Sequence, residues 1–236
     1  MNQMKSYTPE EVAKAIIKFC RARLFRPKGR KFIFLSGNGG SGKTELSKII
    51  SNGAQKYGHT NVIDMDDFVV DTKLRNSATI KWNDAEKGEQ IGRYTTSFAA
   101  SYFLQNVKAI LCNIEKGNNY YHWPKKATDA KECRLLYGDA ILTIIDGMGT
   151  VFLDKNKSQS VTIFMQCSKE LEIARRIKRA RFSNEKDEEE VRKQFAERNS
   201  QYKAMIEPHK KEYGLVLESM KDFSLSVIRD DYGILS

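Results

Sequence analysis

The segment from Gly37 to Thr44 constrains the fold of this chain more than any other stretch of its sequence. It reads GNGGSGKT and fits the pattern G-x-x-x-x-G-K-[ST] at every fixed position. Its glycines let the backbone curl around a phosphate with the N–H groups pointing inward. Lys43 supplies a positive charge for the outer phosphates of a triphosphate, and the Thr44 hydroxyl can bind Mg²⁺. The segment therefore predicts a phosphate-binding loop.

The flanking residues support this interpretation. Residues 31–36 (KFIFLS) form a short apolar run that predicts a buried strand, and residues 44–55 predict a helix. This helix would point its positive N-terminus at the bound anion. A glycine-rich turn with an incidental Gly-Lys-Thr is the weaker alternative, because the strand–loop–helix order matches what phosphate binding requires.

The rest of the chain alternates short apolar strands with helices. Further strands are predicted at residues 61–64, 140–145, 161–165, 215–217 and 223–227, and further helices at residues 8–23, 96–115, 170–181 and from 187 onward. Residues 71–94 are predicted to be polar and mobile, and residues 118–134 to be irregular. This alternation predicts one α/β domain over residues 1–236, with a parallel sheet covered by helices on both faces. Within it, residues 1–29 would form an N-terminal helix and a basic linker.

Two groups of carboxylates follow predicted strands. Asp64, Asp66 and Asp67 come at the end of the strand at 61–64, and Asp146 closes the apolar run AILTII. Ligands of open α/β sheets gather at the carboxyl ends of strands, so an acid there can accept a proton from a hydroxyl or hold Mg²⁺ through water. A solvated acidic turn is the alternative for each group, and the neighbouring phosphate-binding loop favours the functional interpretation.

A basic helix supplies the third candidate. The sequence from Arg175 to Arg181 reads RRIKRAR, and helical spacing places Arg175 and Arg179 on one face. Phosphoryl transfer needs cations that close over the developing negative charge. In a chain with a phosphate-binding loop, we therefore favour a mobile arginine lid at about residues 175–200 over a solvated basic helix.

These pieces, in this order, resemble the uridine kinase-like branch of the P-loop kinases, which includes uridine kinase, nicotinamide riboside kinase, phosphoribulokinase and pantothenate kinase. The resemblance covers about residues 31–217 and is clearest in GNGGSGKT, in DDF at 66–68, in IDG at 145–147 and in ARRIKR at 174–179. It implies a three-layer P-loop NTPase fold with a helical arginine lid, to which the N-terminal helix is an addition. It also implies Mg²⁺-dependent transfer of the γ-phosphate of ATP (or GTP) to a small hydroxyl-bearing acceptor.

The resemblance assigns roles to individual residues. Asp66 would be the general base, assisted in catalysis by Lys43 and Arg179, and the metal would be held by Thr44, Asp66 and Asp146. The lid would contain Arg175, Arg176, Arg179 and Arg181. Nucleotide binding would involve Gly37, Asn38, Gly39, Gly40, Ser41, Gly42, Lys43, Thr44 and Glu45.

The acceptor side departs from the uridine kinase pattern. Uridine kinases carry an aspartate that grips the ribose hydroxyls, whereas residues 95–101 here read TTSFAAS and contain no acid. Charge-assisted hydrogen bonds contribute about 1.5–3 kcal/mol each, so ribose would be held poorly without that acid. Phe68, Tyr121, His122 and Trp123 are alternative acceptor-binding candidates, although an aromatic cluster also anchors loops.

The composition limits the classes of partner that we expect for this chain. The chain of 236 residues has a net charge of +10, and six basic residues fall between Arg21 and Lys31. A basic surface favours anionic partners or is simply solvated. The four cysteines form no C-x-x-C pair, so we expect free thiols in the cytoplasm and no zinc site. No run of 18 apolar residues occurs, so we expect no membrane span. A homo-oligomer is one option.

Three functions are compatible with the sequence. The first is a kinase for a nucleoside acceptor. The second is a P-loop kinase for a non-nucleoside or anionic acceptor. The third, which we favour least, is a nucleic-acid-associated NTP-binding protein whose segment 21–31 contacts phosphates.

Overall fold

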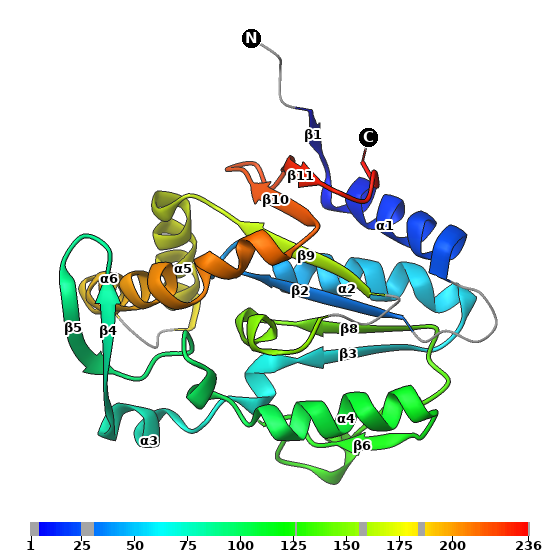
Figure 1. Ribbon diagram of the computed structural model, residues 1–236, viewed down its shortest axis with the longest axis horizontal. Coiled ribbons are helices and arrows are strands. Elements are labelled where there is room, and N and C mark those ends of the chain that lie inside the picture. The colour runs from blue at the N-terminus through cyan, green and yellow to red at the C-terminus, as the bar shows by residue number, and fades with distance from the viewer. Residues whose placement is uncertain (1–4, 25–30, 126, 156–159, 184–186, 236) are drawn as a thin grey trace.

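A seven-stranded sheet forms the centre of the computed structural model, which describes residues 5–24, 31–125, 127–155, 160–183 and 187–235 (Figure 1). Its strand order is β1-β11-β10-β9-β2-β8-β3. The strands are β1 (Ser6–Tyr7), β2 (Phe32–Gly37), β3 (Thr60–Asp64), β8 (Leu142–Asp146), β9 (Ser160–Gln166), β10 (Leu215–Ser219) and β11 (Leu225–Asp230). β10, β9, β2, β8 and β3 are mutually parallel, so their carboxyl ends meet at one edge.

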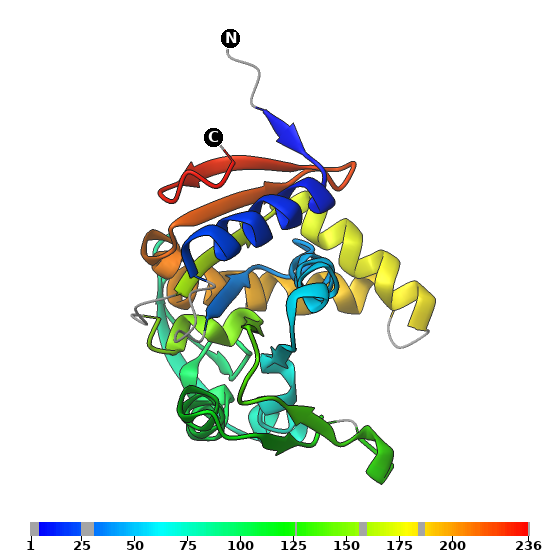
Figure 2. The same ribbon diagram turned by 90° about the vertical axis from the view of Figure 1, so that its right-hand side faces the viewer.

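Helices cover both faces of the sheet because side chains alternate along its strands. Ile33 and Leu35 pack against α1 (Pro9–Leu24) and α2 (Lys43–Ala54). Phe32 and Phe34 point the other way, into a core completed by α4 (Leu104–Lys116). Figure 2, seen at 90° to the first view, shows α1 and α4 on opposite sides of the strands. The predicted three-layer α/β architecture is confirmed.

The sheet is mixed rather than wholly parallel. β11 pairs antiparallel with β10, and the short β1 pairs antiparallel with β11. The predicted strand at 223–227 exists, but a turn at residues 220–224 returns the chain beside β10 and thereby reverses its direction. The predicted helix at 8–23 corresponds to α1 and opens with a capping box, in which Thr8 and Glu11 exchange backbone-to-side-chain hydrogen bonds of 2.8 and 3.1 Å.

Residues 71–94 are ordered, contrary to the prediction of a mobile segment. They form α3 (Thr72–Ser77) and the antiparallel hairpin β4 (Thr79–Asp84) and β5 (Gly88–Arg93). The hairpin packs on α6 (Glu188–Met205): Trp82 Nε1 donates to Ser200 Oγ at 3.0 Å, and Arg93 pairs with Glu197 at 2.7 Å. Contacts with a helix more than 100 residues away thus order this polar segment.

Two further local predictions were wrong. The helix predicted from residue 96 begins at Leu104, because residues 101–103 hydrogen-bond with residues 68–70 and Val69 forms a bridge with Tyr102. Residues 118–134, predicted to be irregular, include β6 (Tyr120–His122), which pairs with β7 (Arg134–Leu136). The basic helix is α5 (Lys169–Ser183). Residues 25–30 of the basic segment lie outside the described residues, as do residues 184–186 between α5 and α6.

Among the described residues, no helix is both long enough and apolar enough to cross a lipid bilayer.

Gly37 offers a test of how tightly the sheet holds the phosphate-binding loop. A Cβ at Gly37, whose φ is +136°, would lie 1.7 Å from the carbonyl oxygen of Met165 on β9. Because that backbone belongs to the neighbouring strand, we expect Gly37→Ala to lower the free energy of unfolding by at least about 3 kcal/mol. Urea denaturation of the purified variant measures this loss.

Gly88 provides the matched control. Its φ is +71°, but a Cβ there would meet no atom within 4 Å. Gly88→Ala should therefore cost only the left-handed backbone penalty of about 1–2 kcal/mol. Equal losses in the two variants would contradict the close contact at Gly37.

Candidate active site

Residues 37–44 form the predicted phosphate-binding loop, between β2 and α2 at the carboxyl edge of the parallel strands. Gly37, Gly40 and Gly42 have positive φ angles, as the curled loop requires. α2 begins at Lys43, and no side chain caps its N-terminus. The N–H groups of its first turn are therefore available to an anion, which the helix dipole would stabilise.

Asn38 fixes this loop to the next parallel strand. Its side chain donates to the carbonyl oxygen of Cys167 at 3.0 Å and to Glu172 Oε2 at 2.8 Å, and it accepts from the Cys167 N–H at 3.0 Å. All three residues are buried. The loop, the end of β9 and the start of α5 thus form one hydrogen-bonded unit.

Lys43 lies at the base of the loop. Its ammonium group donates to the carbonyl oxygen of Asn38 at 2.6 Å. Burial lowers the pKa of Lys43, while the carboxylates of Asp146, Glu172 and Asp66 oppose that shift. The ammonium group is thus within electrostatic reach of the acids from β8, α5 and the turn after β3.

Among the carboxylates of the site, Asp146 has the surroundings that best suit metal binding. It ends β8 beside Asp64 at the end of β3, and it is only 2% exposed. Burial raises the pKa of Asp146, and Lys43 and a hydrogen bond with Thr44 oppose this shift. Its Oδ1 atom has no hydrogen-bond partner among the described residues. A buried carboxylate oxygen without a partner, next to the Thr44 hydroxyl, suits a hydrated Mg²⁺ ion.

The three acids at the end of β3 and just beyond it have different surroundings. Burial raises the pKa of Asp64 to about 6, and its side chain accepts a hydrogen bond from the Asp66 N–H at 2.9 Å. Asp66 lines the cavity beside the loop. Asp67 turns away and accepts hydrogen bonds from His122 at 3.3 Å and from the Lys125 N–H at 3.1 Å. These bonds outweigh burial and lower the pKa of Asp67.

The arginines of α5 occupy several environments. Arg175 donates to the carbonyl oxygens of Gly40 and Met220, both at 2.6 Å, and so ties the helix to the loop and to the end of β10. Arg176 pairs with Glu172 at 2.6 Å and covers Gly39, where a Cβ would lie 2.0 Å from Nη2. Arg179 lines the cavity. Arg181 instead pairs with Glu188 at the surface and does not line it.

A cavity of about 700 Å³ joins these groups. Sequence reasoning missed several residues of its wall, because none belongs to a recognisable motif. Arg75 comes from α3, Phe223 from the turn before β11, and the others from the loop after β5, from α5 and from α6. These others are Thr96, Ser97, Glu172, Phe195, Arg198, Asn199 and Tyr202.

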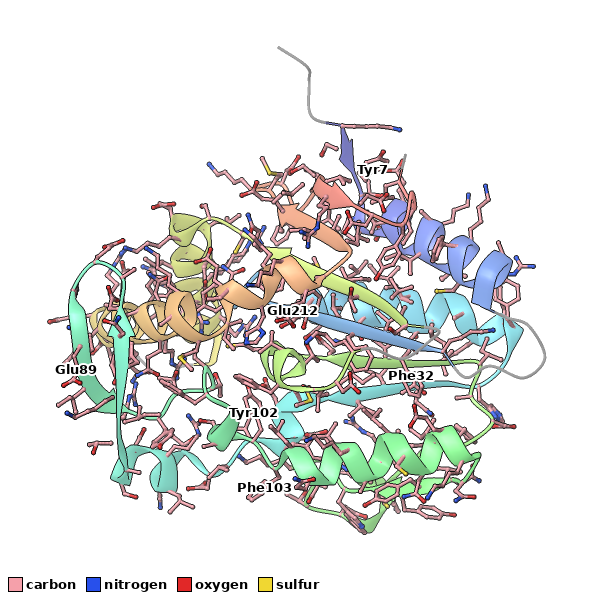
Figure 3. The ribbon with its side chains drawn as sticks, viewed as in Figure 1. Tyr7, Phe32, Glu89, Tyr102, Phe103 and Glu212 are labelled. Carbon is pink, nitrogen blue, oxygen red and sulfur yellow. The ribbon has the colours of Figure 1, made fainter. Side chains whose placement is uncertain are left out.

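Residues 95–101, where uridine kinases carry an acid, do reach the cavity through Thr96 and Ser97. Thr95 is buried and donates to Gln201 Oε1 of α6 at 2.5 Å. The hydroxyl group of Tyr102 donates to the carbonyl oxygen of Thr96 at 2.8 Å. Figure 3 labels Tyr102 inside the fold and its neighbour Phe103 at the surface. The segment therefore presents hydroxyl groups to the cavity and no carboxylate.

The aromatic acceptor candidates lie elsewhere. Phe68 and His122 are both less than 9% exposed and stack on each other, with ring centroids 4.8 Å apart. Tyr121 and Trp123 are 69% and 54% exposed on and beside β6. None of the four residues lines the cavity, so the geometry of the cavity gives no support to their predicted role in acceptor binding.

Comparisons with known proteins agree with this geometry. The Phosphoribulokinase / Uridine kinase family matches residues 32–226. A D-glycerate 3-kinase from Cryptococcus neoformans shares the fold with a TM-score of 0.59 at 11% identity, over 93% of this chain and 97% of that one. The YGR205w protein does so with a TM-score of 0.58 at 14% identity, over 92% and 99%. A search of curated proteins found no match.

The match to the family spans most of the chain and includes the phosphate-binding loop, the acids at the strand ends and the basic helix. The two structural neighbours share the overall fold. This protein belongs to the phosphoribulokinase/uridine kinase family and is an ATP-dependent kinase that acts on hydroxyl acceptors.

Proposed function

We propose that this chain transfers the γ-phosphate of Mg²⁺-bound ATP to a hydroxyl group of a small acceptor, with Asp66 as the general base. The observation that supports it most is a single cavity lined by Lys43, Thr44, Asp66, Asp146 and Arg179. A triphosphate on the loop and a hydroxyl beside Asp66 would share that space. In-line phosphoryl transfer needs this proximity more than it needs covalent chemistry from the protein.

Each residue has a defined part in the step. The acceptor oxygen forms a bond to the γ-phosphorus as the bond to the β-phosphate oxygen breaks, ADP leaves, and Asp66 takes the hydroxyl proton. Lys43 and the N–H groups of the loop stabilise the charge on the phosphates. Arg176 and Arg179 add positive charge from α5, the first half of the proposed lid at about residues 175–200.

The Thr44 hydroxyl and Asp146 are the proposed holders of Mg²⁺, with Asp66 close by. The described residues contain no group of three or more His, Cys, Asp or Glu side chains placed to hold a metal. A nucleotide-borne Mg²⁺ needs no such group, because phosphate oxygens and water complete its six ligands. When bound, the ion would neutralise charge on the β- and γ-phosphates.

The nucleobase is proposed to lie beside Phe223. This ring is 59% exposed, lines the cavity and has the guanidinium group of Arg175 4.5 Å from its centre. Phe223 is also the one non-glycine residue with a positive φ, 66°, among those described. Such strain in a bulky residue is typical of functional sites. An exposed aromatic face at the entrance suits base stacking.

The acceptor is proposed to be a small hydroxyl compound. A nucleoside is what the uridine kinase resemblance implies, but the segment that would grip ribose offers Thr96 and Ser97 in place of an acid. One of the proteins with this fold is a D-glycerate 3-kinase, which shows that the fold also serves a non-nucleoside acceptor. The cavity favours the second alternative.

Asp66→Asn tests the proposed base. The substitution keeps the shape of the side chain and removes its charge, so we expect the single-turnover rate to fall about 10²–10⁴-fold while ATP binding is retained. Rapid-quench measurement of phosphoryl transfer, together with an ATP titration, checks both parts.

Asp67→Asn is the control for this test. Because Asp67 faces His122 and Lys125 rather than the cavity, its substitution should leave the transfer rate within about threefold of the parent. If Asp67→Asn is the impaired variant and Asp66→Asn is not, the base is misassigned.

Phe223→Ala tests the nucleobase position. Loss of one stacking partner should weaken ATP binding by about 1–3 kcal/mol and leave the affinity for inorganic tripolyphosphate, which has no base, unchanged. Phe103→Ala is the control, because Phe103 is also half exposed, at 53%, but does not line the cavity. Parallel losses for ATP and tripolyphosphate in Phe223→Ala would rule out stacking.

A further inference from the structure

Four arginines from four different elements lie close to α6, with Arg198 within electrostatic reach of the other three, and all but Arg93 line the cavity. They are Arg75 of α3, Arg93 of β5, Arg176 of α5 and Arg198 of α6. Burial lowers the pKa of Arg198, and the positive charges of Arg176, Arg93 and Arg75 lower it further. Partly buried guanidinium groups that interact in this way are stabilised by compensating negative charge.

Carboxylates of the protein compensate the positive charge of two of the four arginines. Arg93 pairs with Glu197 at 2.7 Å, and Arg176 pairs with Glu172 at 2.6 Å. Arg75 donates only to uncharged oxygens, those of Val70, Tyr94 and Thr72, at 2.9, 3.3 and 3.2 Å. Arg198 makes no hydrogen bond or ion pair with any residue that the structure describes. Both Arg75 and Arg198 line the cavity.

The net charge of the whole cavity wall is also positive. Eight lysine and arginine side chains and five carboxylates line it, which leaves three positive charges in excess. ATP with one Mg²⁺ brings about two negative charges. About one positive charge is left over, which a carboxylate of charge −1 would balance.

Arg75, one of the two unpaired arginines, lies near the proposed base. Arg75 and Asp66 interact electrostatically, and both line the cavity with Thr96 and Ser97. The hydrogen bonds of Arg75 to backbone oxygens orient its guanidinium group. An acceptor with its hydroxyl at Asp66 can therefore place a nearby anionic group against Arg75 and Arg198.

The position of Arg198 is fixed by the packing of α6. Gln201, one turn later, is fully buried. It accepts hydrogen bonds from the Thr95 N–H and hydroxyl at 3.2 and 2.5 Å and donates to the carbonyl oxygen of Arg93 at 2.9 Å. These bonds set the register of the helix against the hairpin. Arg198 is thus held by a built site rather than by a solvated helix face.

We propose that the acceptor is a small hydroxycarboxylate, whose carboxylate group binds between Arg75 and Arg198 while its hydroxyl group meets Asp66. The guanidinium fork suits a planar carboxylate, which can accept two parallel hydrogen bonds. This inference rests on the proposed function, since it names the acceptor class of the same site.

An acceptor panel tests the class. It contains three- and four-carbon hydroxycarboxylates, their uncharged amides, glycerol 3-phosphate and uridine, each with Mg²⁺ and ATP, and ADP release is measured. We expect turnover of a hydroxycarboxylate with kcat/KM at least 100-fold above that of its amide. Equal use of acid and amide, or a preference for uridine or for glycerol 3-phosphate, overturns the inference and leaves the proposed kinase chemistry standing.

Arg198→Gln tests the residue. It removes the charge and keeps hydrogen-bonding capacity, so the KM of the hydroxycarboxylate should rise about 10–100-fold, with kcat within about threefold and the KM of ATP unchanged. Arg192→Gln on the same helix is the control, because Arg192 pairs with Glu188 and does not line the cavity. A fall in kcat without a change in KM would assign Arg198 to the transferring phosphate and overturn the proposal.

Binding without turnover separates the two proposals. Thermal stabilisation by the hydroxycarboxylate should appear in the parent protein and be lost in Arg198→Gln. If that pattern holds and no compound is phosphorylated, the anion site stands and the proposed function fails. If the acid stabilises neither protein and a neutral acceptor is phosphorylated, the anion site fails and the proposed function stands.

Discussion

The side chain of Asn38 joins the phosphate-binding loop to Cys167 at the end of β9 and to Glu172 at the start of α5. A loop with many N–H groups turned toward one anion places like dipoles together, and it holds its shape only when the surrounding structure fixes it. Because Glu172 also pairs with Arg176, the same network orders the first cation that covers the loop. Loop, lysine and arginine are therefore positioned before a phosphate arrives, which is the condition for electrostatic catalysis.

The cavity has two ends with different structural origins. The sheet builds the nucleotide end: β2, β3 and β8 place the loop, Asp66 and Asp146 at neighbouring strand ends. The acceptor end is built by α6, the β4–β5 hairpin and residues 95–101, which no ladder joins to the central sheet. Because of this division, proteins with this fold can keep the same triphosphate chemistry while the residues that surround the acceptor differ between them.

The parts that could be predicted from the sequence were those with a local cause. The loop at 37–44 and its flanking strand and helix follow from residue type and period alone, and Asp146 follows from its place after an apolar strand. The hairpin at 79–93 gave no such signal, because Trp82 is its one buried residue and its order comes from contacts with α6. Arg198 was missed for a similar reason: a basic residue in a charged helix is usually solvated, and only the tertiary contacts of α6 make it part of a cavity wall. Phe68 and His122 are the opposite case: the sequence suggested that they bind the acceptor, whereas in the structure their rings stack on each other and do not line the cavity.

The contacts of α6 also bear on how the acceptor end of the cavity opens relative to the nucleotide end. Only three of its eighteen residues, Val191, Phe195 and Gln201, are buried, and the hairpin meets the helix largely through hydrogen bonds. A segment with few buried apolar contacts separates from the rest at a lower free energy than global unfolding, and it does so as one cooperative unit. We therefore expect the hairpin and α6 to open as such a unit, whereas β2 is buried along its whole length. Exchange of the acceptor can thus proceed by local opening at this end, on its own timescale, while the nucleotide end stays closed around its ligand.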